Sequence, residues 1–455
     1  MALISINPKN NQEIKKFKEL DDELIAEKID VANVAFYDWR KYSFPHRKTL
    51  MLNVASILDR RKKELAELMT AEMGKPIQQS ISEIEKCKWV CEYYAENAED
   101  FLEEEIIQTD ADRSFVQFDP LGVVLAIMPW NFPFWQVFRF AAPALMAGNV
   151  ALLKHASNVQ MCAREMESIF RDAGFPEGCF TTLLIGSSKV EQVIANSSVK
   201  AVTLTGSEIA GSKVAQFSGR YIKKTVMELG GSDPFIVLED ADIDKAVETG
   251  VKARLINNGQ SCIAAKRFII VENVFDKFKE QFVAKMKAQK IGDPFDESVD
   301  IGPLARQDLM EQLHDQVERS VKNGAKLICG GKPLDREGNY YPPTVVTDIK
   351  PGMPAYEEEL FGPVAALFKV EDVYQALEVA NSSKYGLGAS LWTEDLQKAR
   401  ELTRLIESGS VFINGLVKSD PRLPFGGVKF SGYGRELSHY GIKEFVNIKT
   451  VWIKE

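Results

Sequence analysis

Short apolar runs, each followed by a stretch with helical periodicity, recur between residues 123 and 238. The runs are VVLAIM (123–128), VALLKH (150–155), TTLLIG (181–186), AVTLTG (201–206) and PFIVL (234–238). Continuously apolar strands joined by helices are typical of a parallel sheet covered on both faces. The pattern therefore predicts a doubly wound α/β domain, in which ligands bind at the carboxyl ends of the strands.

Helices are expected before this domain and a second α/β series after it. Long amphipathic runs at residues 21–42, 46–73 and 77–104 predict the helices. The second series is predicted to have strands at 268–271, 326–329, 364–370, 388–392 and 410–415. Residues 445–453 alternate apolar and polar side chains, which fits an edge strand of the chain or a strand added to a partner's sheet.

The composition excludes several classes of protein. With 455 residues, 45% of them hydrophobic and 27% charged, the chain is typical of globular proteins, and the net charge of −9 argues against a nucleic-acid partner. No apolar run approaches the roughly 20 residues of a membrane-spanning helix, and no secretory signal is apparent. Six cysteines without a CxxC pair predict reduced thiols and a cytoplasmic location, and no metal site is expected.

Three motifs contain side chains suited to covalent catalysis. In NNGQSC (257–262), Cys262 follows a glycine-containing turn and can be a nucleophile, or else a buried structural cysteine. In MELGGSDP (227–234), Glu228 ends a strand and can be a general base or an exposed turn residue. In PWNFP (129–133), Asn131 is fixed between prolines and can donate to an oxyanion or cap the next helix.

A phosphate-binding arrangement is expected after another strand. In LTGSEIAG (204–211), Gly206 and Ser207 lie between a strand and a helix, whose first amides can face an anion. Lys154 ends a neighbouring strand and can either bind a ribose or phosphate or reach solvent.

Taken together, these motifs resemble those of NAD(P)-dependent aldehyde dehydrogenases. The resemblance extends from about residue 5 to the C-terminus. It rests on PWNFP (129–133), Lys154, TGS (205–207), ELGG (228–231), GQSC (259–262), ELFGP (359–363), PFGG (424–427) and SGYGRE (431–436), in family order. KHAS (154–157), GGSDPF (230–235) and SGYGRELS (431–438) are most similar to the bacterial succinate-semialdehyde dehydrogenase branch.

The resemblance implies an aldehyde dehydrogenase-like α/β fold in three parts. Residues 1–110 and 121–230 would form a doubly wound, Rossmann-type NAD(P)-binding domain, and residues 231–430 a catalytic α/β domain. Residues 111–120 and 431–455 would form a small β oligomerisation element of a homodimer or homotetramer.

The family's chemistry, carried over to this sequence, assigns a role to each catalytic residue. Cys262 would attack the aldehyde, and the amide of Asn131 and the Cys262 N–H would hold the oxyanion. Hydride transfer would leave a thioester, which water activated by Glu228 would hydrolyse. The family's cofactor-binding positions correspond to Trp130, Lys154, Gly206, Ser207, Leu229, Glu359 and Phe361.

Ser157 bears on the choice of cofactor. Many NAD-selective relatives have a glutamate at this position, where a carboxylate would repel a 2′-phosphate. Ser157 and Lys154 can both bond to that phosphate, so we expect NADP to be accepted, together with NAD.

Arg139, Ser419 and Phe425 are the expected substrate-binding residues. By the resemblance, Arg139 would pair with the carboxylate of succinate semialdehyde. A second arginine of some relatives is replaced by Ile256, for which Arg254, or Lys418 with Ser419, can substitute. Phe140 stands where many relatives have a lysine, so a proton relay that uses this lysine is not expected. Ala264 stands where some relatives have a second cysteine that serves as a redox switch, so this switch is not expected either.

Other functions stay open from the sequence. The enzyme can act on another aliphatic or aromatic aldehyde, or pass its thioester to coenzyme A, although Glu228 argues against the latter. A catalytically inactive binding protein of the same fold is another class of function. A Cys–His hydrolase is a further alternative, but His46, His155, His314 and His439 lie in no recognisable partner motif.

Overall fold

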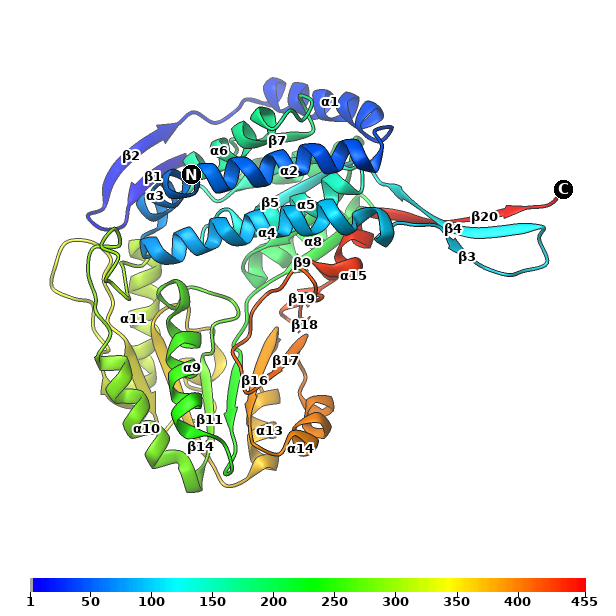
Figure 1. Cartoon of the computed structure of the whole chain (residues 1–455). Helices are drawn as coiled ribbons and strands as arrows, with labels where there is room; N and C mark the ends of the chain where they lie inside the picture. Colours follow the sequence, from blue (N-terminus) through cyan, green and yellow to red (C-terminus); the bar gives the residue numbers. More distant parts are fainter. Residues whose placement is uncertain (1–2) are drawn as a thin grey trace.

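A computed structural model describes residues 3–455 and shows two α/β units and a projecting β arm (Figure 1). One unit contains a six-stranded sheet with the strand order β19-β9-β8-β5-β6-β7. Its strands are β5 (Val123–Met128), β6 (Val150–His155), β7 (Phe180–Thr182), β8 (Val199–Thr205), β9 (Lys224–Glu228) and β19 (Gly432–Tyr433). Strands β5 to β9 are parallel, as predicted, whereas β19 pairs antiparallel with β9.

Helices from the first half of the chain pack around this sheet (Figure 1). They are α1 (Asp22–Trp39), α2 (Phe44–Arg60), α3 (Lys62–Met73), α4 (Ile77–Phe101), α5 (Trp135–Met146), α6 (Gln160–Asp172), α7 (Val190–Ala195) and α8 (Glu208–Arg220). The run predicted as one helix over 46–73 divides at Arg61, whose φ of −100° and ψ of 12° leave the helical range. A hairpin of β1 (Leu3–Asn7) and β2 (Gln12–Phe17) precedes α1 and was not predicted.

The second unit contains a seven-stranded sheet with the order β12-β13-β14-β11-β10-β16-β17. Its strands are β10 (Pro234–Val237), β11 (Arg267–Val271), β12 (Lys326–Cys329), β13 (Thr344–Thr347), β14 (Val364–Val370), β16 (Gly388–Trp392) and β17 (Ser410–Ile413). All its pairs are parallel except β12 with β13, and β13 was not predicted.

Five longer helices belong to this unit, with short elements around them. The helices are α9 (Ile243–Leu255), α10 (Glu272–Lys287), α11 (Gln307–Lys322), α13 (Val373–Asn381) and α14 (Leu396–Leu402). The short elements are α12 (Pro354–Glu357) and the two-stranded pair β15 (Tyr385–Gly386) and β18 (Val428–Lys429). Helix α15 (Ser438–Ile442) packs against α4 and α5 of the first unit instead.

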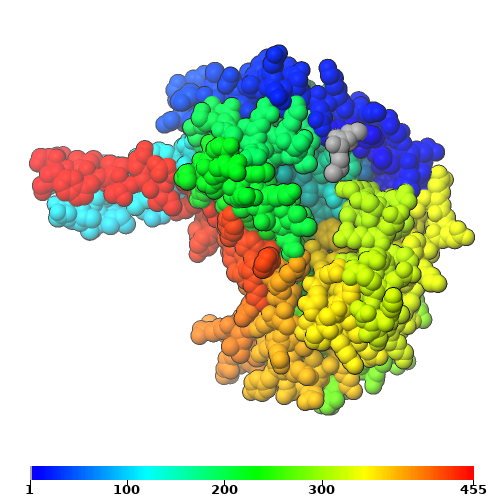
Figure 2. Space-filling model, turned by 180° about the vertical axis from the view of Figure 1, so that it is seen from behind, coloured from blue at the N-terminus to red at the C-terminus, as the bar shows by residue number. Residues whose placement is uncertain are grey.

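The β arm consists of β3 (Glu105–Ile106), β4 (Arg113–Pro120) and β20 (Val446–Ile453) and projects from the body of the molecule (Figures 1 and 2). Strand β20 pairs antiparallel with β4 along its whole length, from Val446 opposite Pro120 to Ile453 opposite Arg113. The C-terminal strand therefore pairs within its own chain, while residues 432–433 join the six-stranded sheet instead of the arm.

Strand register brings the functional motifs to one edge of the six-stranded sheet. Ile127 of β5 lies opposite Leu204 of β8, and Thr205 of β8 opposite Glu228 of β9. The segments after these strands, which contain Asn131, Gly206 and Leu229, therefore leave the sheet at its carboxyl edge. Within residues 3–455, no helix is long and apolar enough to cross a membrane, and no cluster of side chains could hold a metal ion.

Candidate active site

The loop that presents Cys262 begins with three consecutive residues in the left-handed region. The φ values are 53° at Asn257, 57° at Asn258 and 77° at Gly259. Asparagine and glycine tolerate this region better than other residues. At Gly259 a Cβ atom would also clash with the backbone of Gly362. The sequence NNG thus turns the chain sharply after α9 and leaves Cys262 half-buried outside any helix.

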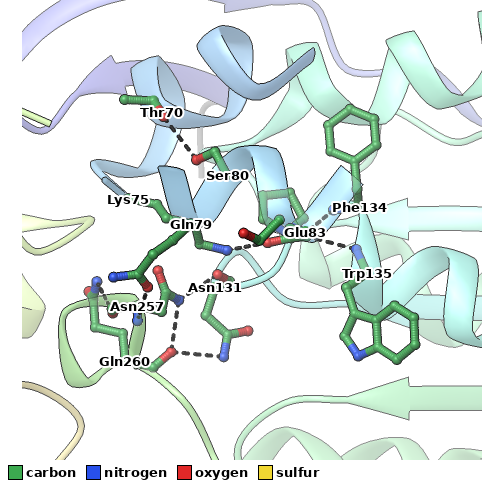
Figure 3. A network of polar contacts seen from close by, with 12 residues as sticks. Thr70, Lys75, Gln79, Ser80, Glu83, Asn131, Phe134, Trp135, Asn257 and Gln260 are labelled. Carbon is green, nitrogen blue, oxygen red and sulfur yellow. Dashed lines mark hydrogen bonds and ion pairs between the residues drawn. The ribbon is translucent and has the colours of Figure 1, made fainter. Parts of the chain in front are cut away.

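Asn131 is held against this loop by a network of hydrogen bonds (Figure 3). Its side-chain Nδ2 donates to the backbone carbonyl of Gln260 over 3.1 Å. The backbone carbonyl of Asn131 accepts from Asn257 Nδ2 over 2.6 Å. The Asn257 N–H donates to Gln79 Oε1 on α4 over 2.6 Å. One amide hydrogen of Asn131 is left for a substrate oxygen, because Nδ2 has two and only one bond is made within the described chain.

Helix α5 is capped by a residue from another helix. Glu83 Oε1 on α4 accepts from the N–H groups of Phe134 and Trp135 over 3.0 and 2.9 Å, and Oε2 pairs with buried Lys75 (Figure 3). Asn131 is therefore not the helix cap, which was the structural alternative for this residue. Its side chain serves the loop of Cys262 instead.

Two cavities meet at Cys262. The first, the cofactor-side cavity, has a volume of about 370 Å³ and lies at the carboxyl edge of the six-stranded sheet. Among its lining residues are Trp130, Asn131, Gly206, Ser207, Leu229, Cys262, Glu359 and Phe361. The second, the substrate-side cavity, has a volume of about 800 Å³. Among its lining residues are Lys86, Trp135, Gln136, Arg139, Ile256, Cys262, Lys418, Ser419 and Phe425.

Glu228 lines neither of these cavities, and its side chain is buried. Neither of its oxygens has a hydrogen-bond partner in the described chain, and a Cβ atom at Gly426 would lie 2.7 Å from Oε1. Burial and the nearby negative charge of Glu436 raise the pKa of Glu228 well above its usual value. The residue is thus not an exposed turn glutamate, and it has the raised pKa expected of a general base.

Comparisons with known proteins agree with this geometry. A family model described as "Aldehyde dehydrogenase family" matches residues 2–451. The chain belongs to the aldehyde dehydrogenase family. It is 53% identical over 453 residues to a probable succinate-semialdehyde dehydrogenase (NADP+) of Synechocystis sp., and 49% identical over 456 residues to a succinate-semialdehyde dehydrogenase (NADP+) of Mycobacterium tuberculosis, with 100% of each chain covered.

A solved structure extends the similarity to the fold. Succinic semialdehyde dehydrogenase from Streptococcus pyogenes, in complex with NADP+, superimposes with a TM-score of 0.97 at 38% identity. The match covers 99% of this chain and 100% of that one. The fold class and the family predicted from the sequence are therefore confirmed.

The cofactor-side cavity has the features that a nicotinamide dinucleotide needs in an aldehyde dehydrogenase. Glu359 Oε1 accepts from the Gly231 N–H over 3.1 Å and lies 3.3 Å from Lys266 Nζ. Oε2 makes no hydrogen bond within residues 3–455 and lies beside Gly230, where a Cβ atom would be 2.5 Å away. One carboxylate oxygen is therefore left for a ribose hydroxyl. Across the cavity, the rings of Trp130 and Phe361 meet edge to face at 5.8 Å.

Lys154 and Ser157 do not line this cavity. Lys154 is opposite Ile127 in the neighbouring strand, so it also leaves the sheet at the carboxyl edge. Both side chains are half-buried. The structure thus places Lys154 at the same edge of the sheet as the cavity but outside its lining.

Lys266 is a site residue that the sequence analysis missed. Its Nζ donates to the carbonyls of Ser261, Cys262 and Ala264 over 2.8 to 3.1 Å and pairs with Glu359. The ammonium thus fixes the loop of Cys262 and connects it to the cofactor-side cavity. No motif marked this lysine, because its partners are backbone carbonyls that any sequence would supply.

Arg139 lies in the substrate-side cavity but is already paired. Only 1% of it is exposed, its Nε pairs with Glu436, and its guanidinium lies 4.5 Å from the ring centre of Phe425. Glu436 was not assigned a role from the sequence, although it ends the SGYGRE motif. The arginine therefore brings less free charge to the cavity than its sequence position implied.

The other predicted substrate residues separate into two groups. Ser419 and Lys418 line the cavity, with Ser419 buried and Lys418 exposed. Arg254, one of the suggested substitutes for the missing second arginine, lines neither cavity; it is fully buried and donates to the Gly259 carbonyl over 2.6 Å. That suggestion is wrong, because the side chain points into the nucleophile loop.

None of the four histidines lines either cavity, which removes the Cys–His hydrolase.

Proposed function

We propose that this protein oxidises succinate semialdehyde to succinate with NADP+, and also accepts NAD+. The observation that carries the proposal is the position of Cys262, which lines both a cavity suited to a dinucleotide and a second cavity that Lys86 and Arg139 also line. The names of the relatives from Synechocystis sp. and Mycobacterium tuberculosis support the same substrate and cofactor.

In the first step, Cys262 Sγ adds to the aldehyde carbon and forms a thiohemiacetal. Burial raises the pKa of the Cys262 thiol to about 12, so the thiol has to pass its proton to water in the cavity as it attacks. The positive charges of Arg139 and Lys266 oppose this shift and favour the thiolate. The oxyanion is held by Asn131 Nδ2 and by the Cys262 N–H, which makes no backbone hydrogen bond in the described chain.

In the second step, the carbon of the thiohemiacetal loses a hydride and becomes the carbonyl carbon of a thioester. Trp130, Leu229, Glu359 and Phe361 would hold a nicotinamide, which would supply the hydride acceptor when bound. Glu228 then removes a proton from water, which attacks the thioester, releases the acid and frees Cys262. Retention of Glu228 favours hydrolysis over transfer to coenzyme A.

Lys154 and Ser157 would bind the 2′-phosphate of NADP+. Lys154 contributes a charge and Ser157 a hydroxyl, without the carboxylate that would repel the phosphate. Arg139, Ser419 and Phe425 would line the binding site for the far end of the substrate.

We also propose a cytoplasmic homodimer or homotetramer built through the β arm. Ile106, Ile448 and Trp452 are exposed on the arm, and apolar side chains on a projecting strand pair suit burial against a second copy. Light scattering coupled to gel filtration would measure the mass in solution. A monomer at micromolar concentration would contradict this part of the proposal.

Absorbance of reduced cofactor tests the proposed reaction directly. We expect kcat/KM to be highest for succinate semialdehyde with NADP+, compared with glutarate semialdehyde, acetaldehyde and benzaldehyde. A higher kcat/KM for an uncharged aldehyde would contradict the proposed substrate but leave the thiol chemistry intact. No reduction of either cofactor would indicate a catalytically inactive member of the family.

A further inference from the structure

Lys86 is a cation without an anionic partner in the substrate-side cavity. It lies on α4, and its Nζ donates to Ser419 Oγ over 2.7 Å and sits 4.2 Å from the centre of the Trp135 ring. No carboxylate oxygen lies within 4 Å of this Nζ in the described part of the chain, although most ammonium groups that are partly buried are paired.

The two carboxylates that stand near Lys86 are both committed elsewhere. Glu83, one turn earlier on α4, pairs with Lys75 and caps α5. Asp420, next to Ser419, binds Arg422 through both oxygens over 2.8 and 2.9 Å. Neither carboxylate is free to turn toward Lys86 without breaking these contacts, so the charge of Lys86 is not balanced by the protein.

Arg139, which also lines the cavity, differs from Lys86 because it has an anionic partner. Arg139 is paired with Glu436, so its charge is largely compensated by the protein itself. Lys86 and Arg139 are close enough for the arginine to lower the pKa of Lys86, after the larger effect of burial. The lining of the cavity also contains Glu83, Glu248, Glu297 and Asp300, but none of them pairs with Lys86 in the described chain. An anionic group on the substrate would balance the Lys86 ammonium.

We propose that Lys86, together with the hydroxyl of Ser419, binds the carboxylate of the substrate and sets the preference for an acidic aldehyde. The Lys86 ammonium has three donors, of which one is used by Ser419, so it can give the others to a carboxylate. The Ser419 hydroxyl accepts from Lys86 and can donate its own hydrogen to the same anion. Lys86 would thus compensate for the second arginine of some relatives, which is Ile256 here; both residues line the same cavity.

The inference rests on the proposed function, and its test compares two aldehydes of equal carbon number. The specificity is the ratio of kcat/KM for succinate semialdehyde to kcat/KM for butanal. We expect Lys86→Met to lower this ratio about 10- to 100-fold, mostly through KM for the semialdehyde. Lys86→Arg keeps the charge and should recover most of the ratio.

A matched control comes from the same helix. Lys88 lies two residues further along α4 and pairs with Asp59 and Glu92, outside the cavity. Lys88→Met makes the same change of charge and should leave the ratio within about twofold, because exposed ion pairs contribute little.

Succinate protection gives a readout that does not require turnover. Succinate should slow alkylation of Cys262 by iodoacetamide in the wild-type protein and in Lys88→Met, but much less in Lys86→Met. Equal loss of activity toward both aldehydes in Lys86→Met, or an unchanged ratio, would overturn the role of Lys86. If the wild-type protein does not oxidise succinate semialdehyde at all, the proposed function fails instead.

Discussion

The two cavities that meet at Cys262 differ in how completely their charged side chains are paired. On the cofactor side, Glu359 and Lys266 neutralise each other, and the lining groups after the strand ends offer backbone amides and aromatic rings. On the substrate side, Arg139 is paired but Lys86 is not. If the proposed function holds, the cofactor would be held mainly by the shape and dipoles of the sheet edge. The substrate would be selected by the charge of Lys86, which has no anionic partner in the described chain.

The largest effect is expected from the residue that both cavities share. Cys262→Ala removes the nucleophile, so activity toward every aldehyde should fall by at least about 10⁴-fold, while NADP+ binding is kept. Initial rates of cofactor reduction and quenching of tryptophan fluorescence by NADP+ measure the two properties. Cys329→Ala is the matched control, since this half-buried cysteine lies on β12, away from both cavities. Residual turnover in Cys262→Ala would mean that another group carries the reaction.

Glu228→Gln should stop the reaction after hydride transfer, before the thioester is hydrolysed. We expect kcat to fall about 10²- to 10⁴-fold, because water is no longer deprotonated and the thioester accumulates. Mass spectrometry of the intact protein would detect the acyl group on Cys262. A full kcat with no acyl-enzyme would assign the base elsewhere.

The pH profile sharpens the role of Glu228. Burial and then Glu436 raise the pKa of Glu228, so its basic form appears only as the pH rises through that pKa, and kcat should rise with it. Glu436→Gln removes the neighbouring negative charge and should move this rise to lower pH. A profile that does not move would show that Glu436 does not influence the base.

Ser157→Glu changes the cofactor side alone. A carboxylate beside the 2′-phosphate should lower kcat/KM for NADP+ about 100-fold relative to NAD+, with the preference for succinate semialdehyde retained. Ser168→Glu, which adds the same charge to α6, is the control. An unchanged NADP+/NAD+ ratio would place the 2′-phosphate at other residues.

The smallest effect concerns the substrate side and the charge of Lys86. Burial, and then the charge of Arg139, lower the pKa of Lys86 to about 8; Glu83, Cys87 and Asp420 are the other titratable groups near it. The ammonium form is present below this pKa, so the ratio of kcat/KM for succinate semialdehyde to that for butanal should fall several-fold as the pH rises above about 8.

Taking the ratio cancels the titration of Cys262 and Glu228, which both substrates share. In Lys86→Arg the fall should disappear, because a guanidinium stays charged. A ratio that falls equally in Lys86→Arg would assign the pH dependence to another group.

Most of the six-stranded sheet and the cofactor side of the site could be predicted from the sequence. Continuous apolar runs joined by helices favour strands buried on both faces, and parallel strands align their carboxyl ends, so Asn131, Gly206 and Leu229 were expected at one edge. The run at 234–238, which was counted in the same series, instead forms β10 of the second sheet. The order of the motifs also identified the family and predicted Cys262 as the nucleophile. These features are local in sequence or follow from strand pairing, which is why they could be read in advance.

Which charges remain unpaired could not be predicted from the sequence. Arg139 was expected to meet the substrate carboxylate, but Glu436 lies 297 residues away in sequence and pairs with it. Lys86 looks like one of many helix-surface lysines until α4 brings it to Ser419. An ion pair depends on distances between side chains from separate elements, and these distances exist only once the helices have packed against the sheet.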